Sequence, residues 1–259
     1  MRRQFTINGD FAHLKATGVA RYAGEVVAAL DRLAAEGHAA LDGLELGLVV
    51  KDGAPRIPRL AAIEVRRVPD LRGRLPQSWV QLVLPRHVGH GLLSLCNIGP
   101  LAVARQILCI HDVHPLQFPA SYSRAFRAYN RLVLPRLGRR VARITTVSAF
   151  SRSMLAAHGI APAERIEVTY NGHEHVLREP PDRALRARLP RRYVLAIGRD
   201  LAYKNTGLAF AIAPRLEAAG IDVALVGDFD AGRCLGAAAP PANVHLLGRV
   251  DDAVLAGLM

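Results

Sequence analysis

Short runs of apolar residues alternate along the chain with longer segments in which apolar residues recur at helical spacing. Such runs predict strands, and the helical spacing predicts amphipathic helices. The expected strands are 5–8, 44–50, 63–68, 91–96, 106–111, 143–148, 165–170, 193–198, 223–227 and 244–250. The expected helices are 19–33, 78–88, 122–141, 149–158, 206–219 and 251–259, with a kink or break at Pro135. Alternation of this kind predicts parallel sheets covered by helices on both faces.

The alternation is interrupted after Asn171-Gly172 by a polar stretch with prolines that extends to Pro190. Stretches of this composition favour loops, and we interpret this one as a domain junction. The expected fold class is therefore α/β, with two Rossmann-like, doubly wound parallel-sheet domains at residues 1–172 and 173–259. The second domain contains only three expected strands, so we expect it to be incomplete.

Composition supports a folded protein, because 51% of the 259 residues are hydrophobic and only 22% are charged. No apolar stretch approaches the length of a membrane-spanning helix. Cys96, Cys109 and Cys234 are scattered and form no C-x-x-C pair, which favours reduced thiols in a cytosolic protein. We therefore expect a cytoplasmic protein.

The net charge of +12 predicts attraction to an anionic partner, such as nucleotide phosphates, nucleic acid or an acidic membrane face. Aromatic residues make up only 5% of the chain and no nucleic-acid-binding motif is present, so we expect no nucleic-acid partner. On the helix expected at 122–141, Arg124, Arg127 and Arg131 share one face and no acidic residue accompanies them. That face suits peripheral contact with anionic lipid, and an ordinary solvated surface is the alternative.

Lysine is rare in this arginine-rich chain, since only Lys15, Lys51 and Lys204 occur. Lys204 and Arg199 belong to the turn between the strand 193–198 and the helix 206–219. In doubly wound sheets ligands bind beyond the carboxyl ends of the strands, so the two cations can converge on a phosphate. The alternative is a pair of solvated charges on a loop.

Two further candidates follow expected strands of the first domain. Gly18 precedes the first helix, where a glycine lets a phosphate approach the helix N-terminus, and a simple turn glycine is the alternative. His111 ends the strand 106–111 and can meet a substrate hydroxyl, or it can be a structural histidine that caps the loop. Neither G-x-G-x-x-G nor G-x-x-x-x-G-K-[ST] occurs, which argues against an NAD-binding protein or an ATPase. The histidines offer no convergent ligand set, so we expect no metal.

Seven segments, in order, resemble a family 4 glycosyltransferase of the GT-B fold. They are TGVARYAGEVVAAL, IHDVHPLQFPASYS, ITTVSAFSRSML, IEVTYNGHEH, YVLAIGRDLAYKNTG, VALVGDFD and VHLLGRVDDAVLAGL. The resemblance implies two facing Rossmann-like domains with a nucleotide-sugar in the cleft. It also implies transfer of the sugar, with retention and without metal or cofactor, to a carbohydrate or lipid-linked acceptor, as in the synthesis of cell-envelope polysaccharide.

The resemblance also implies residue roles. Arg199 and Lys204 would grip the donor diphosphate and stabilise charge on it as it departs. Gly18 would face the phosphates, His111 would lie near the donor sugar and the acceptor, and the backbone around Val250 would approach the base.

The sequence departs from the family at two places. His173-Glu174 follows Asn171-Gly172, where the family has an apolar residue and then an acidic one. The family's glutamate-rich segment would follow Met259, so we expect this chain to be truncated and inactive alone. A nucleotide-sugar epimerase or phosphorylase of the same fold, or a non-catalytic basic module that binds membrane or nucleic acid, are the alternatives.

Overall fold

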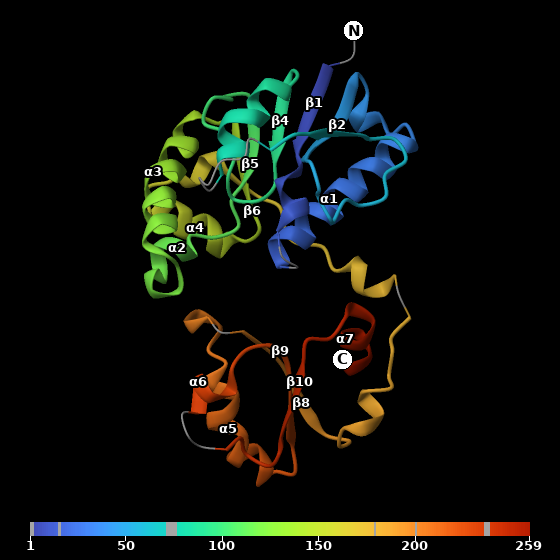
Figure 1. The fold of residues 1–259 in the computed structure, drawn as a ribbon, viewed down its shortest axis with the longest axis vertical. Coiled ribbons are helices and arrows are strands. Elements are labelled where there is room, and N and C mark those ends of the chain that lie inside the picture. Colours follow the sequence, from blue (N-terminus) through green and yellow to red (C-terminus); the bar gives the residue numbers. More distant parts are fainter. Residues whose placement is uncertain (1–2, 15–16, 71–76, 179, 200, 236–238) are drawn as a thin grey trace. The chain divides into compact units, whose positions relative to one another are not determined.

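The computed structural model describes residues 3–14, 17–70, 77–178, 180–199, 201–235 and 239–259. Contacts divide the chain into two compact units, each built on its own parallel sheet (Figure 1). Unit 1 comprises Met1–Gln117 and Arg124–Gly172, and unit 2 comprises Phe118–Ser123 and His173–Met259. The two parallel sheets with their helices confirm the expected α/β fold class.

The described residues of unit 1 form a seven-stranded parallel sheet in the order β3-β2-β1-β4-β5-β6-β7. The strands are β1 (Arg3–Asn8), β2 (Leu44–Lys51), β3 (Glu64–Val68), β4 (Gly91–Ser94), β5 (Gln106–Cys109), β6 (Arg143–Thr146) and β7 (Ile166–Val168). The chain builds outward from β1 to β3 on one side and then from β4 to β7 on the other. The direction reverses between β1 and β4, and the crevice outside the carboxyl ends of such strands is where doubly wound sheets bind ligands.

The helices of unit 1 are α1 (Gly18–Ala35), α2 (His114–Gln117), α3 (Arg124–Arg140) and α4 (Ala149–Ala157). Apolar side chains of the sheet pack in two clusters, one with Leu137 of α3 and Leu155 of α4, the other with Val27 of α1. Each of these three side chains is fully buried, and burial of one such side chain contributes roughly 1.5–3 kcal/mol. Both clusters are continuous with the sheet and hold its carboxyl edge in place.

The structure differs from the sequence expectation in two segments that contain a proline. The segment 78–88 is not an α-helix but a π-helical turn (Trp79–Val83) followed by a 3₁₀ turn (Leu84–His87), because Pro85 has no N–H to bond the Gln81 carbonyl. Helix α3, in contrast, continues through Pro135 without a break. The Arg136 side chain donates to the Leu132 carbonyl at 2.6 Å, which supplies a carbonyl near the proline with an additional donor.

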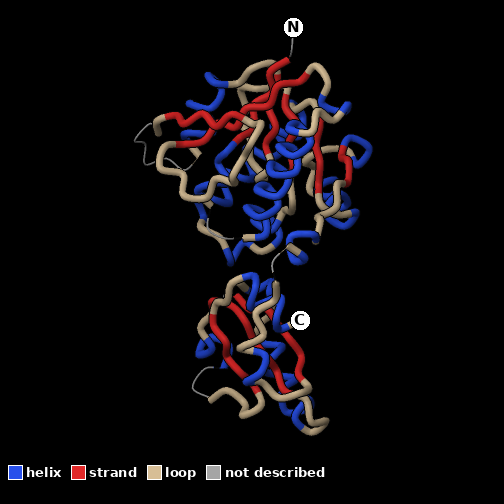
Figure 2. The backbone as a smooth tube through the Cα atoms, turned by 90° about the vertical axis from the view of Figure 1, so that its right-hand side faces the viewer, coloured by secondary structure: helices blue, strands red, loops and turns tan. Residues whose placement is uncertain are grey.

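The described residues of unit 2 form a three-stranded parallel sheet in the order β10-β9-β8, drawn in red in Figure 2. Its strands are β8 (Tyr193–Arg199), β9 (Asp222–Asp228) and β10 (Val244–Gly248), and its helices are α5 (Gly207–Glu217), α6 (Ala231–Leu235) and α7 (Asp252–Leu258). Phe210 and Ala213 of α5 pack against Val223, Leu225 and Val244 of the sheet. This core fixes the loops that follow β8 and β10.

No helix among the described residues is long and apolar enough to cross a bilayer. Cys96 and Cys109 are free thiols, and the side chain of Cys234 lies outside the described part of the chain.

Candidate functional site

Arg199 and Lys204 lie on one short turn at the carboxyl edge of the unit 2 sheet. Arg199 is the last residue of β8, and Lys204 closes the 3₁₀ turn before α5, where its N–H donates to the Leu201 carbonyl at 2.8 Å. Both side chains are exposed, and neither has a hydrogen-bond or ion-pair partner among the described residues. The Nζ of Lys204 lies 5.7 Å from the ring centroid of Tyr203. Two exposed cations at this edge, one of them next to a helix N-terminus, can bind a phosphate group.

Thr206, a residue that the sequence reasoning missed, shapes this turn. It occupies the N-cap position of α5, but its hydroxyl makes no capping bond. The side chain is buried, and its hydroxyl bonds the backbone of Arg199 instead. A threonine at an expected helix start was the available signal, although it predicts a cap and not this contact.

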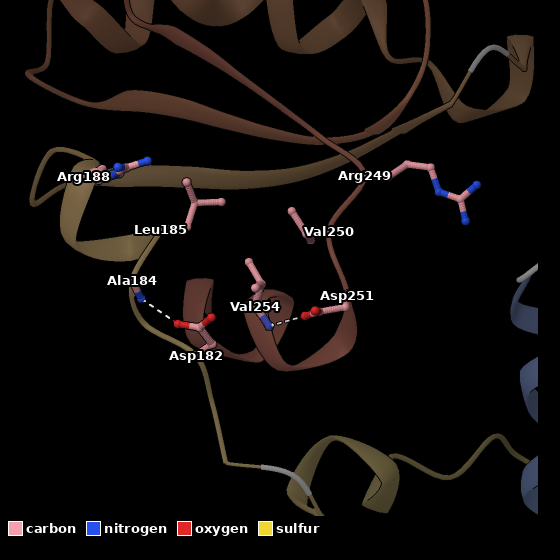
Figure 3. Close-up of a pocket in the computed structure, with 8 residues that line it drawn as sticks. All are labelled: Asp182, Ala184, Leu185, Arg188, Arg249, Val250, Asp251 and Val254. Atoms are coloured by element: carbon pink, nitrogen blue, oxygen red, sulfur yellow. Dashed lines mark hydrogen bonds between the residues drawn. The ribbon is translucent and has the colours of Figure 1, made fainter.

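Val250 lines a cavity of about 520 Å³ beside the carboxyl end of β10 (Figure 3). Leu185, Val250 and Val254 lie between Arg188 on one side and Arg249 on the other (Figure 3). The other lining residues are Asp182, Ala184 and Asp251. The cavity therefore combines an apolar centre with two arginines at its margins.

The two carboxylates of this cavity are engaged by backbone groups. Asp182 accepts the Ala184 N–H at 2.9 Å, and Asp251 accepts the Val254 N–H at 2.9 Å. Each carboxylate therefore has one backbone donor, and the two acidic groups line the same cavity as the two arginines. Neighbouring strands lie about 4.8 Å apart, so the ends of β8 and β10 are separated by roughly 10 Å.

Gly18 is the first residue of α1 and lies just beyond the crevice strand β1. Thr17 caps the helix by accepting the Ala20 N–H at 3.3 Å. The backbone of Gly18 is not left-handed, and no described atom lies within 4 Å of the place a Cβ would take. Packing among the described residues of unit 1 therefore does not require glycine here.

His111 follows β5 at the same edge and is only 6% exposed. Its Nε2 lies 2.9 Å from the Leu95 carbonyl, and the ring of Tyr22 meets it edge-on at 4.8 Å between centroids. Burial lowers the pKa of His111, although the hydrogen bond to Leu95 opposes this effect. The ring is therefore neutral at neutral pH and can exchange hydrogen bonds with a hydroxyl group.

The structure brings some of the expected residues together within each unit. Tyr22 lies four residues after Gly18 on α1 and contacts His111, so these two candidates belong to one edge of unit 1. The sequence reasoning did not identify Asn97, whose side chain accepts the His111 N–H. The sequence around Asn97 indicates only a turn, because an asparagine shortly before Gly99-Pro100 is typical of turns.

The arginines of α3 form a separate surface. Arg124 and Arg131 are exposed and Arg127 is half-buried. The buried residues of the helix are Asn130, Val133, Leu134, Leu137 and Gly138. Phe126 and Leu132 are also exposed, at 37% and 54%. Among the described residues, no group of three or more His, Cys, Asp or Glu side chains could hold a metal ion.

Residues 16–176 match the model of the family described as Glycosyltransferase Family 4, which is more than half of the chain. The match includes Gly18, His111 and the α3 arginines, whereas Arg199, Lys204 and Val250 lie beyond it. No curated protein matches the chain in sequence.

Several solved structures resemble the whole chain. Anabaena Alr3699/HepE, crystallised with UDP and glucose, is 17% identical, with 99% of this chain and 71% of that chain covered and a TM-score of 0.59. WaaG, a glycosyltransferase involved in lipopolysaccharide biosynthesis, is 14% identical over 98% of this chain and 72% of that chain, with a TM-score of 0.59. A trehalose-6-phosphate protein from E. coli, bound with UDP-2-fluoro glucose, is 12% identical over 97% of this chain and 75% of that chain, with a TM-score of 0.54. At these identities the likeness concerns the fold.

Proposed function

The chain belongs to glycosyltransferase family 4, and on this premise we propose that it transfers a sugar from a nucleotide-sugar to a carbohydrate or lipid-linked acceptor. In this reaction the bond between the anomeric carbon and a diphosphate oxygen breaks. A new bond forms between that carbon and an acceptor oxygen, the acceptor hydroxyl gives up its proton, and the nucleoside diphosphate leaves. The configuration at the anomeric carbon is retained in this proposal.

The observation that carries the proposal is the turn that presents Arg199 and Lys204 at the carboxyl edge of β8. We assign the donor diphosphate to these two cations. Negative charge accumulates on the diphosphate as it departs, and fixed positive groups stabilise that charge without reorganisation. This electrostatic role requires no metal ion, which agrees with the proposed mechanism.

The cavity beside Val250 supplies a place for the base of the same nucleotide. Its apolar centre suits the faces of a heterocycle, and Arg188 and Arg249 can meet ribose or phosphate oxygens. The roughly 10 Å between the ends of β8 and β10 is a span that a nucleoside diphosphate can bridge. In unit 1, we assign Gly18 to a phosphate and His111 to a hydroxyl of the sugar or acceptor.

The basic face of α3 suits an acceptor that is anchored in a membrane. Three arginines lie along this face, and Phe126 and Leu132 are exposed elsewhere on the same helix. Positive charge and exposed apolar side chains on one helix are typical of peripheral membrane helices. We propose that this face contacts anionic lipid and that the protein is cytoplasmic, at the inner side of the membrane.

Thermal unfolding with a panel of nucleoside diphosphates and nucleotide-sugars tests the donor assignment. A ligand at a hundred times its Kd stabilises the folded protein by about 2.7 kcal/mol. UDP and UDP-glucose are the first probes, because a structural neighbour was crystallised with UDP and glucose. Lys204→Ala should abolish this stabilisation, whereas Arg215→Ala, which removes an exposed charge from α5, should preserve it. Absence of stabilisation by every nucleotide would refute the proposal.

A further inference from the structure

Asn97 lies in the loop after β4, at the edge where the strand order of unit 1 reverses. Its backbone φ of 64° is left-handed. Few residues other than glycine adopt this conformation, and asparagine is among those that tolerate it. Strained backbone that persists in a folded protein concentrates at functional sites, so the contacts of Asn97 are informative.

Asn97 joins the loop after β4 to the end of β5 by two hydrogen bonds. Its N–H donates to the Cys109 carbonyl at 3.0 Å, and its Oδ1 accepts the His111 N–H at 2.7 Å. The left-handed turn thus directs the backbone and the side chain of one residue to the same short segment. Cys109 and His111 flank Ile110, so this segment is held on both sides.

The same loop holds the imidazole ring of His111. The Leu95 carbonyl lies 2.9 Å from Nε2 and can only accept a hydrogen bond. Nε2 therefore carries the proton of the neutral ring, and Nδ1 is the acceptor. Among the described residues Nδ1 has no hydrogen-bond partner, and the residue as a whole is 6% exposed.

We propose that Asn97 is a positioning residue that holds the 95–97 loop against β5. In that position His111 keeps its Nε2 proton on Leu95 and offers Nδ1 as a hydrogen-bond acceptor to a hydroxyl group of a sugar. This role rests on the proposed function, which supplies the sugar. In this role His111 is not a cation that binds phosphate. A neutral ring with Nδ1 unprotonated accepts a hydrogen bond from a hydroxyl group and carries no positive charge that would attract a phosphate.

Nitrogen NMR of the 259-residue chain, labelled with ¹⁵N in histidine, tests the arrangement directly. The signal of His111 is identified among the ten histidines by its loss in His111→Asn. The wild-type ring should be neutral and protonated at Nε2. Asn97→Gly retains access to the left-handed backbone but removes Oδ1, so the ring should become a mixture of the two neutral tautomers.

Two further variants separate positioning from general loss of structure. Asn97→Asp keeps an acceptor oxygen in place and should keep the proton of His111 on Nε2. Asn130→Ala removes a different asparagine of unit 1, which is buried and donates to the Phe126 carbonyl at 2.8 Å, and should leave the His111 signal unchanged.

A wild-type ring protonated at Nδ1 would overturn the proposal, as would an unchanged His111 signal in Asn97→Gly. If the glycine variant does not fold, the wild-type tautomer and the aspartate variant still decide the matter. In a transfer assay, kcat/KM should fall about a hundredfold in Asn97→Gly, because misplacement of a catalytic contact by about 1 Å has that effect. It should recover in Asn97→Asp. A tautomer change in a protein that binds no nucleotide or nucleotide-sugar would reject the proposed function and leave the positioning role standing.

Discussion

The hydroxyl of Thr206 accepts a hydrogen bond from the Arg199 N–H at 3.1 Å and donates one to the Arg199 carbonyl at 3.0 Å. One side chain thereby satisfies both backbone groups of a residue seven positions earlier. The contact closes the turn that contains Lys204 and fixes where the Arg199 side chain leaves the strand. Gly198 allows this approach, because a Cβ there would lie 2.8 Å from the Thr206 methyl group.

Thr206→Val keeps the shape of the side chain but removes both hydrogen bonds. The Arg199 N–H loses this partner, whereas the Arg199 carbonyl still accepts the Leu201 N–H at 2.7 Å. An unpaired backbone group costs about 1–3 kcal/mol when buried. We expect the free energy of unfolding to fall by about 1–2 kcal/mol, which is near the lower end of that cost because Arg199 is exposed. Nucleotide binding should also become weaker. Thr206→Ser retains the hydroxyl and should restore binding. Denaturant unfolding and calorimetric titration with UDP measure the two effects. Equal binding by the valine and wild-type proteins would show that the turn does not depend on Thr206.

Sequence patterns predicted the strands of both units because most of them are short runs rich in apolar residues, although β3 and β8 each have only one buried residue. The contacts of Thr206 and Asn97 could not be predicted in this way. Each depends on a hydrogen bond to a backbone group 7 or 14 residues away, and only the fold brings those groups within reach. The pattern at 78–88 failed for a different reason. Periodicity reports which side chains face the core, and it does not report that Pro85 lacks an N–H.

Replacement of Lys204 tests the donor-phosphate assignment in turnover. In a form of the protein that has sugar-transfer activity, Lys204→Ala should lower kcat by about a hundredfold or more, since a preorganised charge partner contributes roughly 3 kcal/mol to the transition state. Lys204→Arg should recover only part of the rate, because a planar guanidinium does not replace a compact ammonium group. Arg215→Ala is the control for the loss of one positive charge from the same unit. Steady-state transfer kinetics measure these rates, and near-normal turnover in Lys204→Ala would end the assignment.

Gly18 and Gly138 provide a matched pair of glycine substitutions. A Cβ at Gly18 meets no described atom within 4 Å, whereas one at Gly138 would lie well inside contact distance of the Ile160 carbonyl oxygen. Gly18→Ala should therefore leave the free energy of unfolding unchanged or higher, since alanine in a helix is favoured by up to about 1 kcal/mol. Gly138→Ala should destabilise unit 1.

Nucleotide binding separates the two roles of glycine at position 18. If Gly18 leaves room for a phosphate, Gly18→Ala should weaken binding of a nucleotide-sugar although the protein is fully folded. Binding measured by titration at equal protein stability checks this outcome. Unchanged affinity would favour the simple turn glycine that the sequence also allows.

Arg124, Arg127 and Arg131 test the proposed membrane contact. The protein should sediment with vesicles that contain anionic lipid at low salt and dissociate as salt is raised, because screening shortens the range of the attraction. Replacement of all three by Gln should abolish binding. The control replaces Arg59, Arg66 and Arg67, three exposed arginines elsewhere on unit 1, and should retain it. Equal binding of the wild-type protein to neutral vesicles would contradict an electrostatic contact.

Asp31 of α1 links that helix to the segment before β3, and its carboxylate makes stability depend on pH. The side chain is 5% exposed and accepts the N–H groups of Ala61, Ala62 and Ile63, each at 2.8 Å. Burial opposes ionisation of this carboxyl, but the three donors outweigh it and lower the pKa of Asp31 below its ordinary value of 3.8. The folded protein thus binds this proton less readily than the unfolded chain. The contribution is complete above the unfolded pKa and is lost as pH falls through the folded pKa.

Asp31→Asn should therefore destabilise the protein at pH 7 and flatten the acid limb of its stability curve. The amide has one acceptor oxygen in place of two and adds N–H donors that face other donors, so the loss should be about 1–3 kcal/mol. The exposed Asp52 gives the control variant Asp52→Asn, which removes a surface carboxylate from unit 1 and should leave the free energy of unfolding at pH 7 unchanged. Urea unfolding between pH 2 and 7 measures both quantities, because the linkage applies to each carboxyl separately. If Asp31→Asn keeps the full acid dependence of the wild-type protein, the three backbone donors do not stabilise a charged Asp31, and α1 must be held to β3 by apolar packing alone.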